Sequence, residues 1–260
     1  MRIGTYNVLG LTGYPVEEAA RAIGAPGEAT NCDHFAAVFE GLQCDVLALQ
    51  EGVAAHVMQR IARSIGRHVA TFPSPVSWPG HVLSRYPILE SRVFSHAIPA
   101  EETPPFSRCF GATLMEVSPG VRLWVVNVHL HPSDRALRDQ EAGILADRLV
   151  ELQAVTDHVI VLGDFNSEID EEVHRAVRSL DYSNAMEQAG GGIRYTMDTA
   201  GTAPHAIDHI YVSSSLGPRL RSATVVRGDR FRHDGPKAGG LWVHSDHLPV
   251  VAELEAGASW

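Results

Sequence analysis

The chain has 260 residues, of which 45% are hydrophobic and 20% charged, a composition typical of one soluble globular domain. Its formal net charge of −10 argues against a stable complex with duplex DNA, because non-specific DNA affinity comes from neutralising phosphates. Three cysteines without paired spacing argue against a disulfide framework and a cysteine zinc site. No leader peptide and no apolar run of membrane-spanning length are visible, so we expect a cytoplasmic protein, and we expect it to be a monomer.

The predicted elements alternate between strands and helices. The first half predicts a strand at 3–9, a helix capped by Asn31, a strand at 45–50 and a helix at 53–65 that Gly66 ends. Residues 68–128 lose helical periodicity and predict short strands around 82–83 and at 88–94, 110–117 and 121–128. The remainder predicts a helix at 134–154 capped by Ser133, a strand from Ile160 that ends at Gly163, a helix near 170–180, and strands near 207–213, 221–227 and 249–254.

The two halves repeat one pattern. Each has a strand with an asparagine in it, then helical sequence, then a strand with an acidic residue at its end: Asn7 and Glu51 in the first half, Asn127 and Asp164 in the second. This repeat predicts two similar sheet-and-helix layers that meet at a shared site, within one domain covering residues 1–260.

Asp164 and Asn166 follow an apolar strand at alternate positions. Residues two apart on extended backbone point to the same side, so a carboxylate and an amide are expected to project together from the carboxyl end of a core strand. Open sheets place their ligands at this end.

Polar side chains lie at the ends of the other strands too. They are Asn7, Glu51, His129, Asp208 with His209, and the run Ser245-Asp246-His247. Buried acids are unfavourable unless they are paired or bind a metal, so acids that converge on one edge predict a cation between them. Hard oxygen ligands of this kind suit Mg²⁺ or Mn²⁺.

The order of the segments TYNV, LQE, NVHL, GDFNS, IDHIYVS and SDHLPV resembles that of the endonuclease/exonuclease/phosphatase superfamily, which includes the DNase I-like nucleases. The resemblance extends from Thr5 to about Leu254. It implies an α/β fold of the α+β type, a four-layer sandwich in which two mixed β-sheets pack face to face with helices outside. Two positions depart from the family pattern: Leu9, where many abasic-site enzymes carry an acid, and His81, where asparagine is frequent.

The resemblance also implies a function: a Mg²⁺-dependent phosphoesterase that hydrolyses a phosphodiester or phosphomonoester by in-line attack of water. The charge of the chain favours a small or lipid-derived phosphoester, or single-stranded nucleic acid, over duplex DNA. The metal ligands implied are Glu51, Asn7 and Asp246. The catalytic residues implied are His129, Asp164, Asn166, Asp208 and His247, with Asp164 deprotonating water and Asp208 holding His247 protonated.

Two alternatives stay open. His129, His131 and Asp134 form an H-x-H-x-x-D pattern that is close to a binuclear zinc hydrolase, although the Asp-His that should follow is absent. The chain could also be a catalytically inactive scaffold that binds phosphate, although lost catalysis usually leaves an incomplete set of residues.

Overall fold

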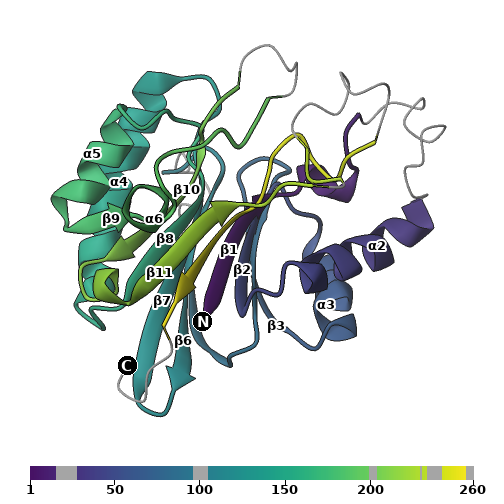
Figure 1. Cartoon of the computed structure of the whole chain (residues 1–260), viewed down its shortest axis with the longest axis horizontal. Helices are drawn as coiled ribbons and strands as arrows, with labels where there is room; N and C mark the ends of the chain where they lie inside the picture. Colours follow the sequence, from purple (N-terminus) through teal and green to yellow (C-terminus); the bar gives the residue numbers. More distant parts are fainter. Residues whose placement is uncertain (16–27, 96–104, 199–203, 229, 233–241, 256–260) are drawn as a thin grey trace.

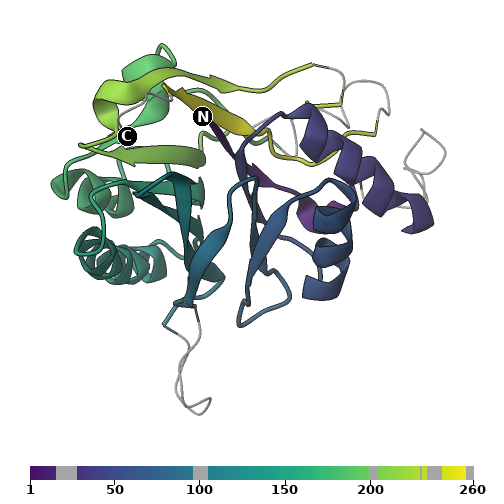
Figure 2. The same cartoon turned by 90° about the horizontal axis from the view of Figure 1, so that it is seen from below.

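Two mixed β-sheets of six strands each pack face to face, and helices cover their outer faces (Figures 1 and 2). The computed structural model describes residues 1–15, 28–95, 105–198, 204–228, 230–232 and 242–255, with the backbone alone at 28–30. The predicted four-layer α/β sandwich is confirmed.

The two sheets have the same internal plan. The first has the order β11-β12-β1-β2-β4-β3, with β1 (Arg2–Asn7), β2 (Val46–Gln50), β3 (His68–Phe72), β4 (Gly80–Ser84), β11 (Leu220–Val225) and β12 (Val250–Leu254). The second has the order β5-β6-β7-β8-β10-β9, with β5 (Ile88–Val93), β6 (Cys109–Ser118), β7 (Val121–His129), β8 (Val159–Asp164), β9 (Tyr182–Asn184) and β10 (Asp208–Ser213). In each sheet a central parallel pair, β1 with β2 or β7 with β8, lies between antiparallel neighbours, which confirms the repeat seen in the sequence.

The helices form the two outer layers. Helices α2 (Glu28–Gly41) and α3 (Ala55–Ser64) pack on the first sheet, and α4 (Arg135–Gln153) and α5 (Glu172–Ser179) on the second (Figure 1). The short α6 (Ala185–Ala189) follows β9, and two 3₁₀ turns, η1 (Leu9–Leu11) and η2 (Gly217–Arg219), complete the described elements. None of the described helices is long and apolar enough to cross a membrane.

The apolar side chains of the strands alternate between two environments. One set, including Ile3, Val125 and Ile160, fills the space between the sheets, and the other set packs outward against the helices. A strand buried on both faces reads as a continuous apolar run, which is why VLALQ and VIVLG are recognisable as strands.

Three local expectations were wrong. Asn31 lies inside α2, where its amide donates to the Leu11 carbonyl at 2.9 Å, and does not cap the helix. Asp134, and not Ser133, caps α4 by accepting from the Leu137 amide at 3.1 Å. Gly163 does not end its strand: it lies within β8 at φ 150°, and a Cβ there would stand 1.9 Å from the Val128 carbonyl oxygen. The elements β3, β9 and α6 had no counterpart in the prediction.

His81 shows how the interior accommodates polar groups. It stands on β4, fully buried, with Nε2 2.9 Å from the Val53 carbonyl and Nδ1 3.0 Å from the Thr71 hydroxyl. These partners suit a neutral ring that donates through Nε2 and accepts through Nδ1. Burial lowers the pKa of His81 to about 4, although the bond to Val53 opposes this.

A histidine whose pKa is lower in the folded state stabilises the fold less as the pH falls below its unfolded pKa, because the unfolded chain then binds the extra proton. Between about pH 7.5 and about pH 5, His81 alone should remove about 2 kcal/mol of unfolding free energy. Urea denaturation of metal-free protein at both pH values should show that His81→Asn reduces this pH dependence. His68→Asn, which changes an exposed histidine on the neighbouring strand, should leave it unaltered. Equal pH dependence in all three proteins would contradict the assignment.

Candidate functional site

The ends of several strands bring polar side chains to one edge of the sandwich. In the second sheet His129, Asp164 and Asp208 lie side by side, because His129 pairs with Asp164 across β7 and β8, and Asp208 pairs with Asp164 across β10 and β8. In the first sheet Asn7 ends β1, and Glu51 directly follows β2. Both parallel pairs end at this edge, so the sheets contribute to one site.

The Asp164 carboxylate is the centre of the site and is 1% exposed. Its Oδ2 accepts a hydrogen bond from Asn7 Nδ2 at 2.9 Å, and its Oδ1 accepts one from the backbone amide of Asn166 at 2.9 Å. The Nε2 atoms of His129 and His247 lie 3.6 and 3.8 Å from Oδ2. Four predicted site residues, Asn7, Asn166, His129 and His247, therefore surround a fifth, Asp164.

Glu51 approaches this group from the first sheet. Its backbone is in the left-handed region at φ 48°, which turns the chain sharply after β2. Its Oε1 lies 3.9 Å from His129 Nε2, and its side chain is 19% exposed. Burial raises the pKa of Glu51, against the opposing effects of a hydrogen bond from Asn7 and the charge of His247. Among the described residues, the positive charge near the Glu51 carboxylate does not compensate for its burial.

The two histidines of the site have opposite preferences for the proton. Burial lowers the pKa of His247, but the carboxylates of Asp208 and Asp164 outweigh it and raise that pKa well above its usual value. Asp208 Oδ2 lies 2.9 Å from His247 Nδ1, so the pair is directly bonded. Burial lowers the pKa of His129 to about 4, because the opposing effect of Asp164 is smaller. The surrounding protein groups thus favour the charged form of His247 and the neutral form of His129.

Asn166 and Asp246 are held less centrally. Asn166 has φ 47°, and its Nδ2 donates to the Leu130 carbonyl at 3.0 Å, while its amide oxygen has no hydrogen-bond partner among the described residues. Asp246 is half-buried and accepts from the Ser245 hydroxyl at 3.3 Å. Its charge acts to raise the pKa of Glu51, so it lies near the site, but its oxygens belong to neither of the converging ligand groups within the described ranges.

The donor set fits a hard divalent cation. One ligand atom each from Glu51, His129 and Asp164 lie within 4.8 Å of one another, and the same holds for Asp164, Asp208 and His247. Over the part of the chain that the structure describes, no lysine or arginine forms an ion pair with these acids. Asp208 Oδ1 is buried without a hydrogen-bond partner among those residues. Acids placed together in this way repel one another unless a cation lies between them.

The pattern that suggested a binuclear zinc hydrolase has another use in the fold. His131 Nδ1 accepts hydrogen bonds from the amides of Ser133 and Asp134 at 3.3 and 2.9 Å. Asp134 caps α4 with its carboxylate. Both side chains are engaged with backbone amides, and neither belongs to a converging ligand group among the described residues.

The sequence assigned no role to a set of residues that join the two sheets beneath the site, although the repeat included Asn127. Gln50 Nε2 donates to Asn127 Oδ1 at 2.8 Å, and Thr5 donates to Gln50 Oε1 at 3.2 Å. Asn127 in turn donates to the carbonyls of Leu49 and His81 at 2.9 and 3.0 Å. Polar residues inside otherwise apolar strands were the available signal. Thr196, whose hydroxyl accepts from the Asp208 amide at 3.1 Å, gave no signal because it stands alone in a loop.

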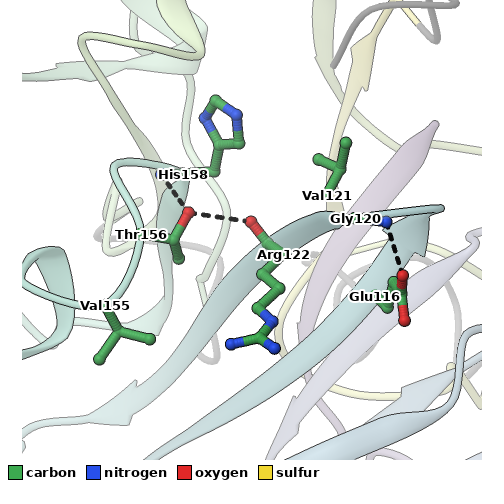
Figure 3. A pocket seen from close by; sticks show the side chains of 7 residues that line it. All are labelled: Glu116, Gly120, Val121, Arg122, Val155, Thr156 and His158. Atoms are coloured by element: carbon green, nitrogen blue, oxygen red, sulfur yellow. Dashed lines mark hydrogen bonds between the residues drawn. The ribbon is translucent and has the colours of Figure 1, made fainter.

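A surface hollow of about 410 Å³ lies elsewhere and can be set aside (Figure 3). It adjoins the first residues of β7 and the loop before β8, at the opposite ends of the two strands from His129 and Asp164. Two hydrogen bonds lie within its lining: Thr156 donates to the Arg122 carbonyl at 3.1 Å, and Glu116 accepts from the Gly120 amide at 2.6 Å.

Comparisons with solved structures give the same fold throughout. An endonuclease/exonuclease/phosphatase family protein from Bacteroides thetaiotaomicron superposes with a TM-score of 0.72 at 19% identity, covering 98% of this chain and 97% of the other. A mannosyl-6-phosphatase from the same species gives 0.71 at 18% identity, with 98% and 100% covered. The 3′ phosphatase NExo from Neisseria, bound to a product DNA hairpin, gives 0.69 at 18% identity, again with 98% and 100% covered.

No curated protein sequence matches the chain. The model of the Endonuclease/Exonuclease/phosphatase family matches residues 4–247, which is nearly the whole sequence and includes every site residue described above. The chain therefore belongs to the Endonuclease/Exonuclease/phosphatase family and is a hydrolase of phosphoester bonds.

Proposed function

We propose that the chain is a Mg²⁺- or Mn²⁺-dependent phosphoesterase that hydrolyses a phosphodiester or phosphomonoester by in-line attack of water. The observation that supports this most is the buried Asp164 carboxylate, which contacts Asn7, Asn166, His129 and His247 while Glu51 stands beside it from the other sheet. Such hydrolysis needs a positioned water, neutralised phosphoryl oxygens and a stabilised leaving group.

Each residue has a role in this proposal. Asp164 orients the attacking water and takes its proton, and the free amide oxygen of Asn166 accepts a hydrogen bond from the same water. His247, held as an imidazolium by Asp208, stabilises the negative charge that develops on the phosphoryl oxygens. His129 donates a hydrogen bond to one of these oxygens from its neutral ring.

Glu51 would be the principal metal ligand, with Asn7 and Asp246 beside it. The bound cation would supply Lewis-acid polarisation of the phosphoryl oxygens and would offset the repulsion among the acids. Asn7 also fixes Asp164 by hydrogen bonding, so it connects the metal ligand to the base.

For the substrate, we propose a small or lipid-derived phosphoester or a single-stranded nucleic acid end. The net charge of −10 supports this choice over duplex DNA. The fold neighbours are in keeping with it: one is named a mannosyl-6-phosphatase, and TDP2 of D. rerio was solved with a single-strand DNA product.

The direct test is a panel of substrates assayed with Mg²⁺, with Mn²⁺ and with EDTA. The panel contains bis-p-nitrophenyl phosphate, sugar phosphates, inositol phosphates, sphingomyelin, single-stranded DNA, RNA and plasmid DNA. Hydrolysis of at least one small or single-stranded substrate should vanish in EDTA and return with either ion. Full activity in EDTA, or tightly bound zinc in the purified protein, would contradict the proposed metal.

Metal binding can be measured without activity. Mn²⁺ at about a hundred times its dissociation constant should stabilise the fold by about 2.7 kcal/mol, which raises the Tm of a chain of this size by about 5–10 °C. Glu51→Gln should lose most of this shift, because it removes the ligand charge and keeps the shape. The control Glu253→Gln, on the exposed side of β12, should keep the shift. An undiminished shift in Glu51→Gln would remove Glu51 from the metal site.

Asp208 and His247 should act as a unit. Asp208→Asn and His247→Ala should each lower kcat by about a hundredfold, the scale of a lost electrostatic contribution to the transition state. The double variant should be little worse than His247→Ala alone, because Asp208 acts through the imidazole. Losses that multiply in the double variant would show that the two residues act separately.

A further inference from the structure

Helix α4 carries two charged side chains into the interior one turn apart. Glu141 is fully buried and Arg138 is 7% exposed. The remaining buried residues of the described helix are apolar or small, and they pack on the second sheet. Charged groups are rarely buried unless each is paired and hydrogen-bonded, so the contacts of this pair need an explanation.

The Glu141 carboxylate joins two chain segments that flank the site. Its Oε1 accepts from the amide and the hydroxyl of Ser107 at 2.8 and 2.6 Å, and its Oε2 accepts from the His131 amide at 3.0 Å. The ladder of β6 and β7 ends at the pair Cys109 and His129. Ser107 and His131 would be the next pair of the same parity, and the carboxylate bridges their amides where direct pairing stops.

Arg138 bonds to the carbonyl of His131, whose amide bonds to Glu141, and also to Glu171 at the start of α5. Its Nη1 donates to the His131 carbonyl at 3.0 Å. Its Nε and Nη2 donate to Glu171 Oε2 at 3.1 and 2.8 Å, and Nη2 also donates to Oε1 at 3.1 Å. Glu171 Oε1 also accepts from the Glu168 amide at 3.3 Å, in the loop that follows Asn166. We call Arg138 and Glu141 the α4 clamp.

One residue connects the α4 clamp to the reacting groups. Leu130 lies between His129 and His131, and its amide donates to the Asp164 carbonyl at 3.0 Å. Its carbonyl accepts from Asn166 Nδ2 at 3.0 Å. The course of the backbone through residues 129–131 therefore determines the positions of both the His129 ring and the side-chain amide of Asn166.

We propose that Arg138 and Glu141 are positioning residues for phosphoester hydrolysis. By hydrogen bonding to the carbonyl and the amide of His131, they fix His129 and Asn166 relative to Asp164. This role rests on the proposed function of the site. Within the described ranges, neither clamp residue forms a hydrogen bond or ion pair with Glu51, so the clamp should affect the reacting groups and not the metal ligand on the first sheet.

The experiment compares Glu141→Gln, Arg138→Met and their double variant in the full chain. In Glu141→Gln one side-chain oxygen becomes an N–H donor that faces another donor, and in Arg138→Met the ion pair with Glu171 is lost. Each single variant should lower kcat by about ten- to a hundredfold, the scale of a displacement of catalytic groups by a fraction of an ångström to one ångström. KM and the Mn²⁺ dependence of Tm should stay near the parental values. The double variant should be little worse than the more impaired single variant.

The chain offers a matched control. Arg148 and Glu151 form an ion pair at the same spacing on the exposed side of α4, so Arg148→Met and Glu151→Gln should leave kcat unchanged. Arg138→Lys, which keeps the charge opposite Glu171, should recover part of kcat and guards against loss of folding in Arg138→Met. Amide hydrogen exchange at His131 should be faster in Glu141→Gln than in the parent protein.

Three outcomes would overturn the proposal. Parental kcat in folded Glu141→Gln and Arg138→Met would show that the α4 clamp is only structural. A loss of kcat matched by a loss of the Mn²⁺ shift would show that it acts through the metal. A parent protein without metal-dependent hydrolysis would overturn the proposed function and this role with it, whereas an active parent with unaffected clamp variants would overturn the role alone.

Discussion

The hydrogen bond from Asn7 to Asp164 is the contact on which the site depends. It joins residues 157 positions apart and connects one sheet to the other at the edge where the residues of the candidate site gather. Because Asp164 is fully enclosed, both of its oxygens must be satisfied, and Asn7 and the Asn166 amide do this. Loss of Asn7 would remove the side-chain hydrogen bond of a buried carboxylate oxygen and one of the hydrogen bonds between the two sheets.

Below this contact the Gln50–Asn127 hydrogen bond makes a second connection between the sheets, at the depth of the apolar interior. Apolar packing does not depend on direction, whereas a hydrogen bond between two side-chain amides forms at only one position of the sheets relative to each other. The sandwich therefore combines a non-directional interior with directional hydrogen bonds between the sheets, which include those of Asn7 and Asn127. Residues on different sheets, such as Glu51 and His129, are held within 4 Å by this combination.

The central strands and most of the site are predictable from the sequence because one physical rule governs both. Buried strands are continuous apolar runs, and parallel strands end at a common edge, so the pattern of residues alone places Asn7, Glu51, His129 and Asp164 together. The α4 clamp could not be found this way, because Arg138 and Glu141 look like ordinary surface residues of a helix. The cap of α4 was also unpredictable, since Ser133 and Asp134 are adjacent and both suit an N-cap.

Each sheet holds only part of the candidate site: Asn7 ends β1 and Glu51 follows β2 in the first, and His129, Asp164 and Asp208 lie on strands of the second. The apolar side chains that separate the sheets, such as Ile3, Val125 and Ile160, thereby act as spacers that set the distance between the two halves of the candidate site. A substitution there that preserved stability while changing side-chain volume would still alter that distance. The interior of the sandwich thereby acts on the geometry of the site as well as on the stability of the fold.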